Sequence, residues 1–311
     1  MSELKIQKPF LKWVGGKSQM MEYIKKYIPN NIQDYHEIFL GGGSVLFLIL
    51  SLVEQKTIFI TGTINAYDLN KALINTYEKI KTDCESLLIE LKKLKDEFTS
   101  IIENTKKQRG APKNINEETK NETREHYYYF IRGKFNEVDK DSTLAAAYFI
   151  FLNKTGFRGM YREGRDGSFN IPYGLKDTKK IPSIYDENEI RKISKMIENV
   201  KFKCLSYKES LTQITNVNDY VYLDPPYAPE NSNSFVGYNE EGFTIDNHKE
   251  LFKIIQKLNS KKIKFLLSNA KVDLVTEHFP SEQYKIQHIE ARRAINSKNP
   301  GAKTTEVLIS N

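Results

Sequence analysis

The feature that most constrains this chain is an apolar run that stops abruptly at an acid, two prolines and an aromatic ring. Residues 219–223 favour a β-strand because they combine aromatic and branched side chains, and residues 224–227 read DPPY. Proline has no N–H to donate to a neighbouring strand, so the strand must end there. The stretch predicts a rigid strand tip carrying the carboxylate of Asp224 and the ring of Tyr227. Taken alone, it also fits an ordinary turn after a core strand.

A glycine turn marks a second strand end nearer the N-terminus. Residues 37–40 favour a strand, residues 41–43 are all glycine, and an apolar helix is expected from Ser44. Strand, glycine turn and helix form the first unit of a doubly wound sheet, where the backbone approaches a ligand. A dinucleotide fingerprint would need glycine in place of Leu46, and a triphosphate loop in the GGKS stretch would need glycine in place of Leu11. The turn therefore suits a ligand with little phosphate.

An acid follows the next β-rich run. Residues 57–65 favour a strand, and Asp68 comes just after it. An acidic residue at the tip of the second strand is well placed to bind ribose hydroxyls. The alternative is that Asp68 caps the helix expected at residues 71–80.

Basic and aromatic side chains gather in one loop. Residues 151–180 contain seven basic and three acidic residues interleaved with aromatic rings. Residues 153–174 lack helical periodicity and predict a loop or hairpin, which could be an ordinary solvated one. Aromatic side chains beside arginines can also wedge into base steps while guanidinium groups read guanine edges. Residues 291–303, basic and without an acid, are a second expected phosphate contact.

Whole-chain properties limit the remaining choices. The net charge of +7 and the pI near 9.0 favour a polyanionic partner. The sequence contains no run of eighteen apolar residues, the length needed to span a membrane. Its N-terminal residues lack the apolar core of a secretory signal, so we expect a cytoplasmic protein. Cys84 and Cys204 are expected to be buried thiols. The five histidines are far apart, so no metal is expected.

Strands and helices alternate along most of the chain, which predicts an α/β fold with a mixed sheet. The aromatic residues in the helices expected at residues 127–135 and 144–152 are interpreted as core. Residues 103–125 predict an exposed polar loop, and residues 228–242 a lid over the site.

Five stretches together resemble the Dam-type N6-adenine DNA methyltransferases, the alpha group of the D12 class. They are FLKWVGGK, FLGGG, AYDLN, the loop from GFRGMYR to FNIPYG, and LDPPY followed by LLSN. The resemblance covers nearly the whole chain and keeps the motif order of that group. Each stretch alone has low specificity, whereas five in register are highly specific. Residues 103–125 are longer and more polar than this family usually shows.

The resemblance implies a Rossmann-like mixed sheet of the S-adenosylmethionine-dependent type with an inserted, mostly helical target-recognition domain. The catalytic domain would comprise residues 1–70 and 200–311, and the target-recognition domain residues 71–199. The implied reaction transfers a methyl group from S-adenosylmethionine to N6 of an adenine flipped out of double-stranded DNA. The target would be GATC or a closely related short palindrome, and a cognate restriction endonuclease is a further candidate partner.

The resemblance also assigns roles at the strand tip. The N6 lone pair is conjugated into the ring and is a poor nucleophile. Asp224 and the carbonyl of Pro225 would accept its N–H bonds and free that lone pair, with Pro226 stiffening the tip and Tyr227 stacking on the base. Lys17 would lie near the methionine carboxylate. The full set expected to bind the cofactor is Trp13, Lys17, Phe39, Gly41, Gly42, Gly43, Asp68 and Asp224.

For DNA, matching to the family places Lys12, Met160 and Arg162 on base edges and Phe157 beside the flipped base. Arg158 stands where family members often carry asparagine. The full set expected to contact DNA is Lys12, Lys154, Phe157, Arg158, Met160, Arg162, Asn170, Arg292 and Arg293.

Two other functions remain open from the sequence. A nicotinamide-dependent Rossmann oxidoreductase is disfavoured by Leu46, which breaks the glycine fingerprint. A non-catalytic DNA-binding protein with a methyltransferase-like fold is disfavoured by the intact DPPY stretch.

Overall fold

The computed structural model describes residues 6–17, 19–102, 115–175, 181–229, 242–292 and 303–311, without the side chains of residues 291–292 and 303–304. It divides into two compact units. The first contains Met1–Gln7, Lys17–Leu69 and Lys203–Asn311, and the second contains Lys8–Gly16 and Asn70–Phe202. The short segment Lys8–Gly16 therefore groups with the second unit, although the sequence suggested one uninterrupted N-terminal part.

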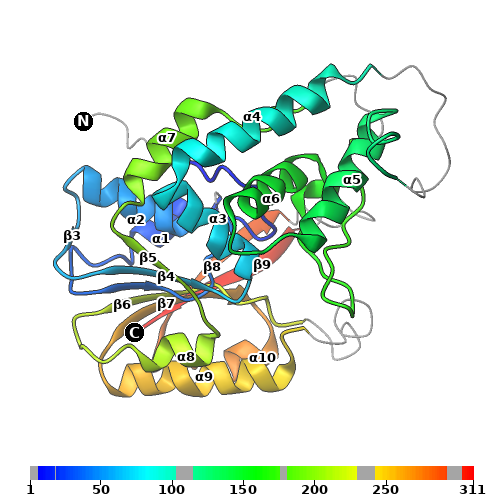
Figure 1. Cartoon of the computed structure of the whole chain (residues 1–311). Helices are drawn as coiled ribbons and strands as arrows, with labels where there is room; N and C mark the ends of the chain where they lie inside the picture. The colour runs from blue at the N-terminus through cyan, green and yellow to red at the C-terminus, as the bar shows by residue number, and fades with distance from the viewer. Residues whose placement is uncertain (1–5, 18, 103–114, 176–180, 230–241, 293–302) are drawn as a thin grey trace. The chain divides into compact units, whose positions relative to one another are not determined.

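A mixed sheet was predicted, and the structure has one with seven strands, which lies in the first unit except for residues 200–202 of one edge strand (Figure 1). β2 (Tyr35–Glu37) pairs in parallel with β4 (Ile64–Asp68) and β6 (Tyr220–Leu223), and β6 pairs in parallel with β7 (Lys264–Ala270). β9 (Lys303–Ser310) runs antiparallel between β7 and β8 (Lys285–Arg292). In spatial order the strands are β5 (Val200–Cys204), β4, β2, β6, β7, β9 and β8.

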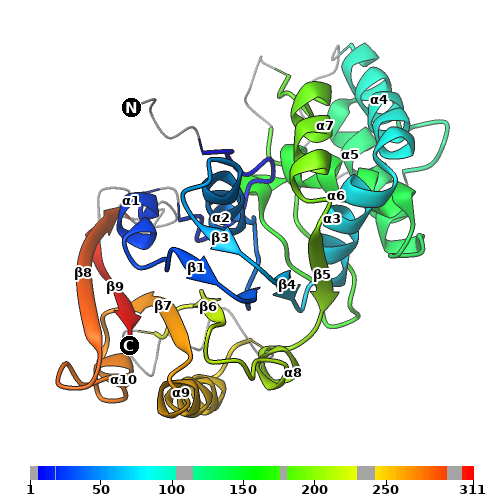
Figure 2. The ribbon, with the colours of Figure 1, turned by 90° about the vertical axis from the view of Figure 1, so that its left-hand side faces the viewer.

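Helices cover both faces of this sheet. α8 (Tyr207–Thr212), α9 (Ile245–Ser260) and α10 (Asp273–Thr276) lie along one face, and α1 (Met21–Lys25) and α2 (Ser44–Glu54) lie on the other (Figures 1 and 2). A separate parallel pair joins β1 (Asn31–Ile32) to β3 (Phe59–Ile60). Apolar side chains of β6, β7 and α9 form a buried core beneath the sheet, which fixes the strand tips in place.

The second unit is mainly helical. It contains α3 (Lys71–Thr82), α4 (Cys84–Ser100), α5 (Arg124–Glu137), α6 (Thr143–Thr155), the 3₁₀ turn η1 (Phe157–Gly159) and α7 (Glu187–Met196). α6 packs against α3, α4 and α5. Tyr127, Phe135 and Phe151 are almost completely buried, with Tyr127 and Phe151 in edge-to-face contact at 5.6 Å. The prediction that the aromatic stripe is core is confirmed.

Several predicted boundaries were wrong. The β-rich run at residues 57–65 forms β3 and the start of β4, because Gly62 breaks it. Residues 153–155 belong to α6 rather than to the following loop. Of the polar stretch 103–125, residues 103–114 lie outside the described residues, and α5 begins at Arg124 after the N-cap Thr123.

The two cysteines were also predicted incorrectly. Cys204 is exposed at the end of edge strand β5, and Cys84 is half-buried as the first residue of α4. Neither cysteine forms a disulfide within the described residues, and the Cys204 thiol donates to Leu69 O at 3.5 Å. An edge strand and a helix N-terminus leave these positions without a covering layer, which the apolar character of the side chain alone does not reveal. Among the described residues, no helix has the length and apolarity needed to cross a bilayer.

Candidate active site

The central strand of the sheet ends at the carboxylate of Asp224. All four residues of β6 are buried, Pro225 is buried, and Asp224 and Tyr227 are half-buried. β6 is parallel to β2, which is parallel to β4, so their carboxyl ends meet at one edge. Ligands of open α/β sheets bind at that edge. The arrangement brings Asp224 to the same edge as the glycine turn after β2.

Asp224 forms an ion pair with a buried lysine. Lys17 Nζ lies 2.6 Å from Asp224 Oδ2, and the two side chains are 5% and 18% exposed. Burial raises the pKa of the Asp224 carboxyl, while the Lys17 ammonium lowers it and the Glu306 carboxylate raises it further. Lys17 thus acts directly on the catalytic candidate, a contact that the sequence did not predict.

Tyr227 is anchored by its hydroxyl. The hydroxyl donates to Glu306 Oε2 on β9 at 2.9 Å and lies 2.9 Å from Ser268 Oγ on β7. Lys17 Nζ lies over the ring, 5.0 Å from its centroid. The backbone N–H of the next residue, Ala228, donates to Asn269 Oδ1 at 3.0 Å. The ring orientation is therefore fixed by strands on one side of β6.

The glycine turn contacts Asp68. Gly41 and Gly43 have φ values of 50° and 71°, a left-handed conformation that glycine adopts without strain. The Gly41 N–H donates to Asp68 Oδ2 at 2.9 Å. Asn70, rather than Asp68, caps α3, accepting from the Leu73 N–H at 3.0 Å. The helix-cap alternative for Asp68 is therefore wrong.

Aromatic rings surround Phe39 in the loop before the glycines. Its ring stacks on Tyr207 at 6.2 Å between centroids and meets Phe243 edge-on at 5.9 Å. The turn is also braced by backbone bonds, because the Ile38 N–H donates to Tyr222 O at 3.0 Å. These contacts hold the Phe39 ring in place as an apolar surface beside the glycine turn.

Glu37, the last residue of β2, is a buried acid. It is 1% exposed and accepts a hydrogen bond from the Tyr35 hydroxyl at 2.7 Å. Burial raises the pKa of Glu37 to about 8, and the nearby carboxylates of Asp224 and Asp68 act in the same direction. The neutral form of Glu37 is therefore favoured more strongly than that of an exposed glutamate.

In the second unit, the buried side-chain amide of Asn153 links Lys12, in the N-terminal segment, to the hairpin within residues 153–174. Asn153 accepts from the Lys12 N–H at 2.9 Å and donates to Lys12 O at 2.7 Å. It also donates to Gly159 O at 3.0 Å. Gly159 has φ 66°, and a Cβ there would lie 2.4 Å from Lys12 Cβ. Lys12 is thus seated directly beside the hairpin, and its Nζ reaches Lys154 O at 3.3 Å.

The hairpin presents an exposed ring and exposed guanidinium groups. Antiparallel bridges join Gly156 to Tyr173 and Glu163 to Phe169. Phe157 is 44% exposed, and the Arg158 guanidinium lies 5.2 Å from its ring centroid. Arg158 has φ 56°, a conformation uncommon for residues other than glycine.

Two further side chains of the expected DNA set lie together. The exposed Arg162 donates from Nε to Asn170 Oδ1 at 2.7 Å. Met160 is half-buried, and Lys154 donates from Nζ to Phe10 O. Burial lowers the pKa of the Lys154 ammonium. Asn170 therefore orients Arg162, while Lys154 is engaged with the protein backbone.

Comparison with known proteins identifies the family. Residues 13–295 match the model of the D12 class of N6 adenine-specific DNA methyltransferases. The chain belongs to this family. It is an adenine-specific DNA methyltransferase, and the oxidoreductase alternative is wrong.

Named relatives align along almost the full length of this methyltransferase. It is 36% identical to the type II methyltransferase M.MjaIII of Methanocaldococcus jannaschii over 315 residues, covering 98% of this chain and 99% of the relative. It is 30% identical to the retron Ec67 DNA adenine methylase of Escherichia coli, covering 96% and 89%. It is 27% identical to a DNA adenine methylase of Vibrio cholerae, covering 99% and 96%.

The residues expected from the sequence fall into two groups in this methyltransferase. The first unit brings Lys17, Phe39, Gly41, Asp68 and Asp224 to the carboxyl edge of one sheet or into contact with residues there. The second unit contains Lys12, Trp13 and the residues of the 153–174 hairpin that are expected to contact DNA. The Trp13 ring lies 6.4 Å from that of Phe149.

Some expectations cannot be placed. Arg293 and residues 230–241, the main part of the expected lid, lie outside the described residues. Arg292 is the last residue of β8, and its side chain is likewise outside the description.

Sequence reasoning missed several contributors to the site of this methyltransferase. Ser268 and Asn269 lie in the LLSN stretch, which signals the strand but not their contacts with Tyr227 and Ala228. Glu306 has no local signal, because only the antiparallel pairing of β9 with β7 brings it to Tyr227. Asn153 could have been suspected as a polar residue ending an apolar helix.

Proposed function

We propose that this methyltransferase uses S-adenosylmethionine to methylate N6 of an adenine swung out of duplex DNA, within GATC or a closely related short palindrome. The observation that carries the proposal is the placement of Asp224 at the tip of β6, half-buried and paired with Lys17. A carboxylate held at a strand tip suits an exocyclic amine. Asp224 lies at a strand tip and is followed three residues later by an aromatic ring, Tyr227. Among the described acids at this edge of the sheet, no other has both properties.

The residues at the sheet edge fit S-adenosylmethionine. Asp68 offers a carboxylate for the ribose hydroxyls, beside the main-chain turn at Gly41. Leu69, the next residue, is 74% exposed and offers an apolar surface to a flat ring. Phe39 adds an aromatic wall. When bound, S-adenosylmethionine supplies a methyl group on a positively charged sulfur, and Asp224 provides negative charge nearby.

Asp224 and Pro225 would prepare the amine. By accepting from the two N–H bonds of N6, the Asp224 carboxylate and the Pro225 carbonyl would draw the nitrogen toward tetrahedral geometry. The raised pKa of Asp224 makes its carboxylate a better acceptor for the proton that N6 must lose. Lys17 holds Oδ2 of Asp224 and would fix the carboxylate plane. Tyr227, anchored by Glu306, would stack on the extruded base.

The hairpin of the second unit would read the DNA. Phe157 is an exposed ring that could fill the space left in the helix, and Arg162 is an exposed guanidinium held in one direction by Asn170. Lys12 and Met160 would complete the base contacts. A guanidinium or ammonium on guanine and a thioether on a thymine methyl support a GATC target.

A labelled-cofactor assay tests this proposal. Duplexes that differ by one base from GATC are incubated with the full chain and S-adenosylmethionine carrying a labelled methyl group, and the digested nucleosides are identified by mass spectrometry. We expect N6-methyladenine in the GATC duplex alone, with 2-aminopurine at the target position becoming fluorescent on binding. Label on another base would overturn the proposal, and equal labelling of all duplexes would overturn the target sequence.

We also propose that the chain protects DNA from a cognate restriction endonuclease. Two of its relatives carry the name type II methyltransferase. DNA from a host that expresses the chain should resist an endonuclease cutting at the methylated sequence. Complete cleavage of fully methylated DNA by every endonuclease of that specificity would contradict this role.

A further inference from the structure

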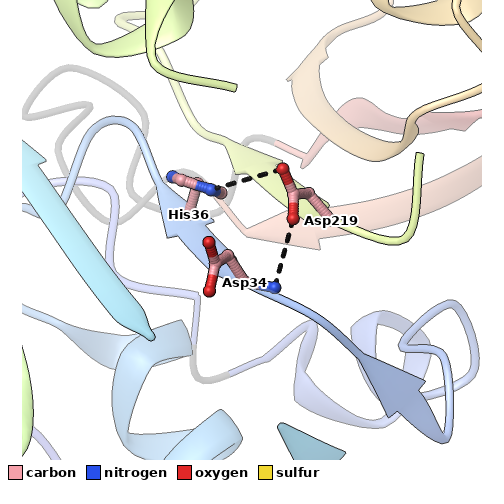
Figure 3. Close-up of side chains that lie close together, drawn as sticks. All are labelled: Asp34, His36 and Asp219. Carbon is pink, nitrogen blue, oxygen red and sulfur yellow. Dashed lines mark hydrogen bonds and ion pairs between the residues drawn. The ribbon is translucent and has the colours of Figure 1, made fainter. Parts of the chain in front are cut away.

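A second cluster of ionisable side chains lies at the amino ends of the central strands. Asp34 precedes β2, His36 lies within β2, and Asp219 precedes β6 (Figure 3). One potential ligand atom of each residue lies within 4.8 Å of the other two. Because β2 and β6 are parallel, with Tyr35 opposite Tyr220, this cluster is at the end of the strands opposite to Asp224. It therefore has no part in the methyl-transfer site.

Main-chain donors hold both carboxylates in place. The Asp34 N–H donates to Asp219 Oδ1 at 3.2 Å, and the Asn216 N–H donates to Asp219 Oδ2 at 3.1 Å. Asp34 Oδ1 accepts from the N–H and hydroxyl of Thr63, at 2.5 and 3.2 Å. Asp219 is 3% exposed, whereas Asp34 is half-buried and reachable from solvent. The two acids are thus organised by the start of three strands rather than by chance proximity on a flexible surface.

His36 points one ring nitrogen into this cluster. Its side chain is buried, at 4% exposure, and Nε2 has no hydrogen-bond partner among the described residues. Nε2 lies 3.9 Å from Asp219 Oδ2, which is beyond hydrogen-bond distance. Nδ1 lies 3.2 Å from the Tyr67 hydroxyl. With the Nδ1 proton donated to that hydroxyl, Nε2 presents a lone pair, the arrangement typical of histidine ligands to metals.

No lysine or arginine of the described residues forms an ion pair with Asp34 or Asp219, whose ion-pair contact is with His36 at Asp219. Lys203 instead donates to Gln213 Oε1 at 2.8 Å and lies over the Tyr67 ring at 5.8 Å. A divalent cation would neutralise both carboxylates and satisfy Nε2 at once.

We propose that Asp34, His36 and Asp219 bind a divalent transition-metal ion of the zinc or manganese type. Mixed imidazole and carboxylate ligands favour such ions over magnesium or calcium, which prefer oxygen alone. Ligand atoms around zinc lie roughly 3.4 Å apart, so the side chains must close inward by about 1 Å, and water would complete the shell. The ion would clamp the start of β2 to the start of β6 and stabilise the sheet.

Sequence spacing could not have revealed this site. Asp219 follows Asp34 by 185 positions, and only one histidine takes part. The expectation of no metal was based on the separation of the five histidines from one another, which does not test ligand sets completed by distant acids.

Metal binding to the full chain tests the proposal. Chelator-treated, metal-free protein is dialysed against Zn²⁺ or Mn²⁺, and bound metal is counted by mass spectrometry. We expect one ion per chain and a rise of several degrees in the thermal midpoint, because the ion binds the folded state. Asp34→Asn keeps an acceptor for Thr63 and removes one charge, so affinity should fall at least tenfold. Asp273→Asn, a matched acid in the first turn of α10, should bind as the unaltered chain does.

Two results of the binding measurement would overturn the proposal. One is equal affinity of Asp34→Asn and the unaltered chain, and the other is no bound ion at a tenfold excess of either metal. If Asp34→Asn fails to fold, the unaltered chain still decides the question. Substitution with Co²⁺ should then give visible absorption bands, and Zn²⁺ should shift the ¹⁵N resonance of His36 Nε2. An unmoved resonance with bound metal would place the ion elsewhere. These readouts are independent of methyl transfer.

Discussion

At the scale of single residues, the site depends on how burial and one lysine balance each other at Asp224. Burial disfavours the carboxylate, and Lys17 Nζ at 2.6 Å favours it. The result is a carboxyl whose pKa lies above its ordinary value, so that it accepts a proton more readily than an exposed carboxylate. Such a proton affinity suits a group that first accepts hydrogen bonds and then receives a proton.

Replacing Asp224 tests its proposed role directly. Asp224→Ala should lower the rate of methyl transfer by a factor on the order of 10³ or more, because a preorganised acceptor is lost. DNA binding, measured by fluorescence anisotropy, should stay within about twofold, since the expected DNA contacts lie elsewhere. Glu282→Ala, an exposed acid in a turn, is the control and should leave both quantities unchanged. Substantial residual transfer by Asp224→Ala would contradict the mechanism.

The pH dependence of the reaction should report the balance at Asp224. The ionised carboxylate is the active form, so the single-turnover rate should fall as pH is lowered through the pKa of Asp224. That pKa lies above the ordinary value because of burial. Lys17→Met removes the group that lowers it, so the acidic limb should move to higher pH. Lys249→Met, an exposed lysine of α9, should not move the limb. A limb unmoved by Lys17→Met would exclude Asp224 as the titrating group.

Arg162 should read one guanine. Its guanidinium is exposed and directed by Asn170 at 2.7 Å. Arg162→Ala should relax discrimination at one guanine by roughly 1 to 3 kcal/mol, measured as kcat/KM on duplexes substituted at each position. Arg165→Ala, in the same exposed hairpin, is the matched control and should weaken binding evenly across sequences. Unchanged discrimination in Arg162→Ala would count against the assignment.

At the scale of elements, the end of α6 organises the expected DNA-reading surface. Asn153 is 5% exposed and makes three hydrogen bonds with the backbone of Lys12 and Gly159. It therefore joins a short N-terminal stretch to the hairpin across a long sequence separation. The position of Lys12 depends on a helix end rather than on its own neighbours in sequence.

Asn153→Ala should destabilise this junction. Removing the amide leaves buried backbone groups without partners, which costs about 1 to 3 kcal/mol. The free energy of unfolding from urea denaturation measures this loss, and discrimination between duplexes should fall with it. Asn199→Ala, at an exposed position, should change stability by less than about 0.5 kcal/mol. Equal stability of the two variants would show that the junction does not support the fold.

At the scale of the whole molecule, the chain carries a net charge of +7. Binding to DNA that depends on phosphate neutralisation releases counterions and weakens steeply with salt. Affinity for a GATC duplex should fall on the order of a thousandfold between 50 and 200 mM salt, measured by anisotropy titration. Affinity for S-adenosylmethionine, which lacks phosphate, should change little over the same range and serves as the internal control. A salt-independent DNA affinity would contradict an electrostatic interface.

Much of this architecture was predictable from local sequence. The strand that ends at Asp224, the glycine turn before α2 and the buried aromatic residues of α5 and α6 follow from proline chemistry, backbone freedom and helical periodicity. Each of these is determined within a few residues. Boundaries were less predictable, as in the run at residues 57–65, because the pairing partner decides how much of a run joins a sheet.

The contacts that give the site its chemistry required the folded chain. Glu306 meets Tyr227 and Asp34 meets Asp219 only because β2, β6, β7 and β9 pair in one register, and Lys17 reaches Asp224 from the segment before α1. The sequence alone determined which strands end in acids and that the glycine turn lacks the fingerprint of a dinucleotide site. The tertiary structure decided which distant side chains share an electrostatic environment, because charge interactions depend on distance and burial rather than on separation along the chain.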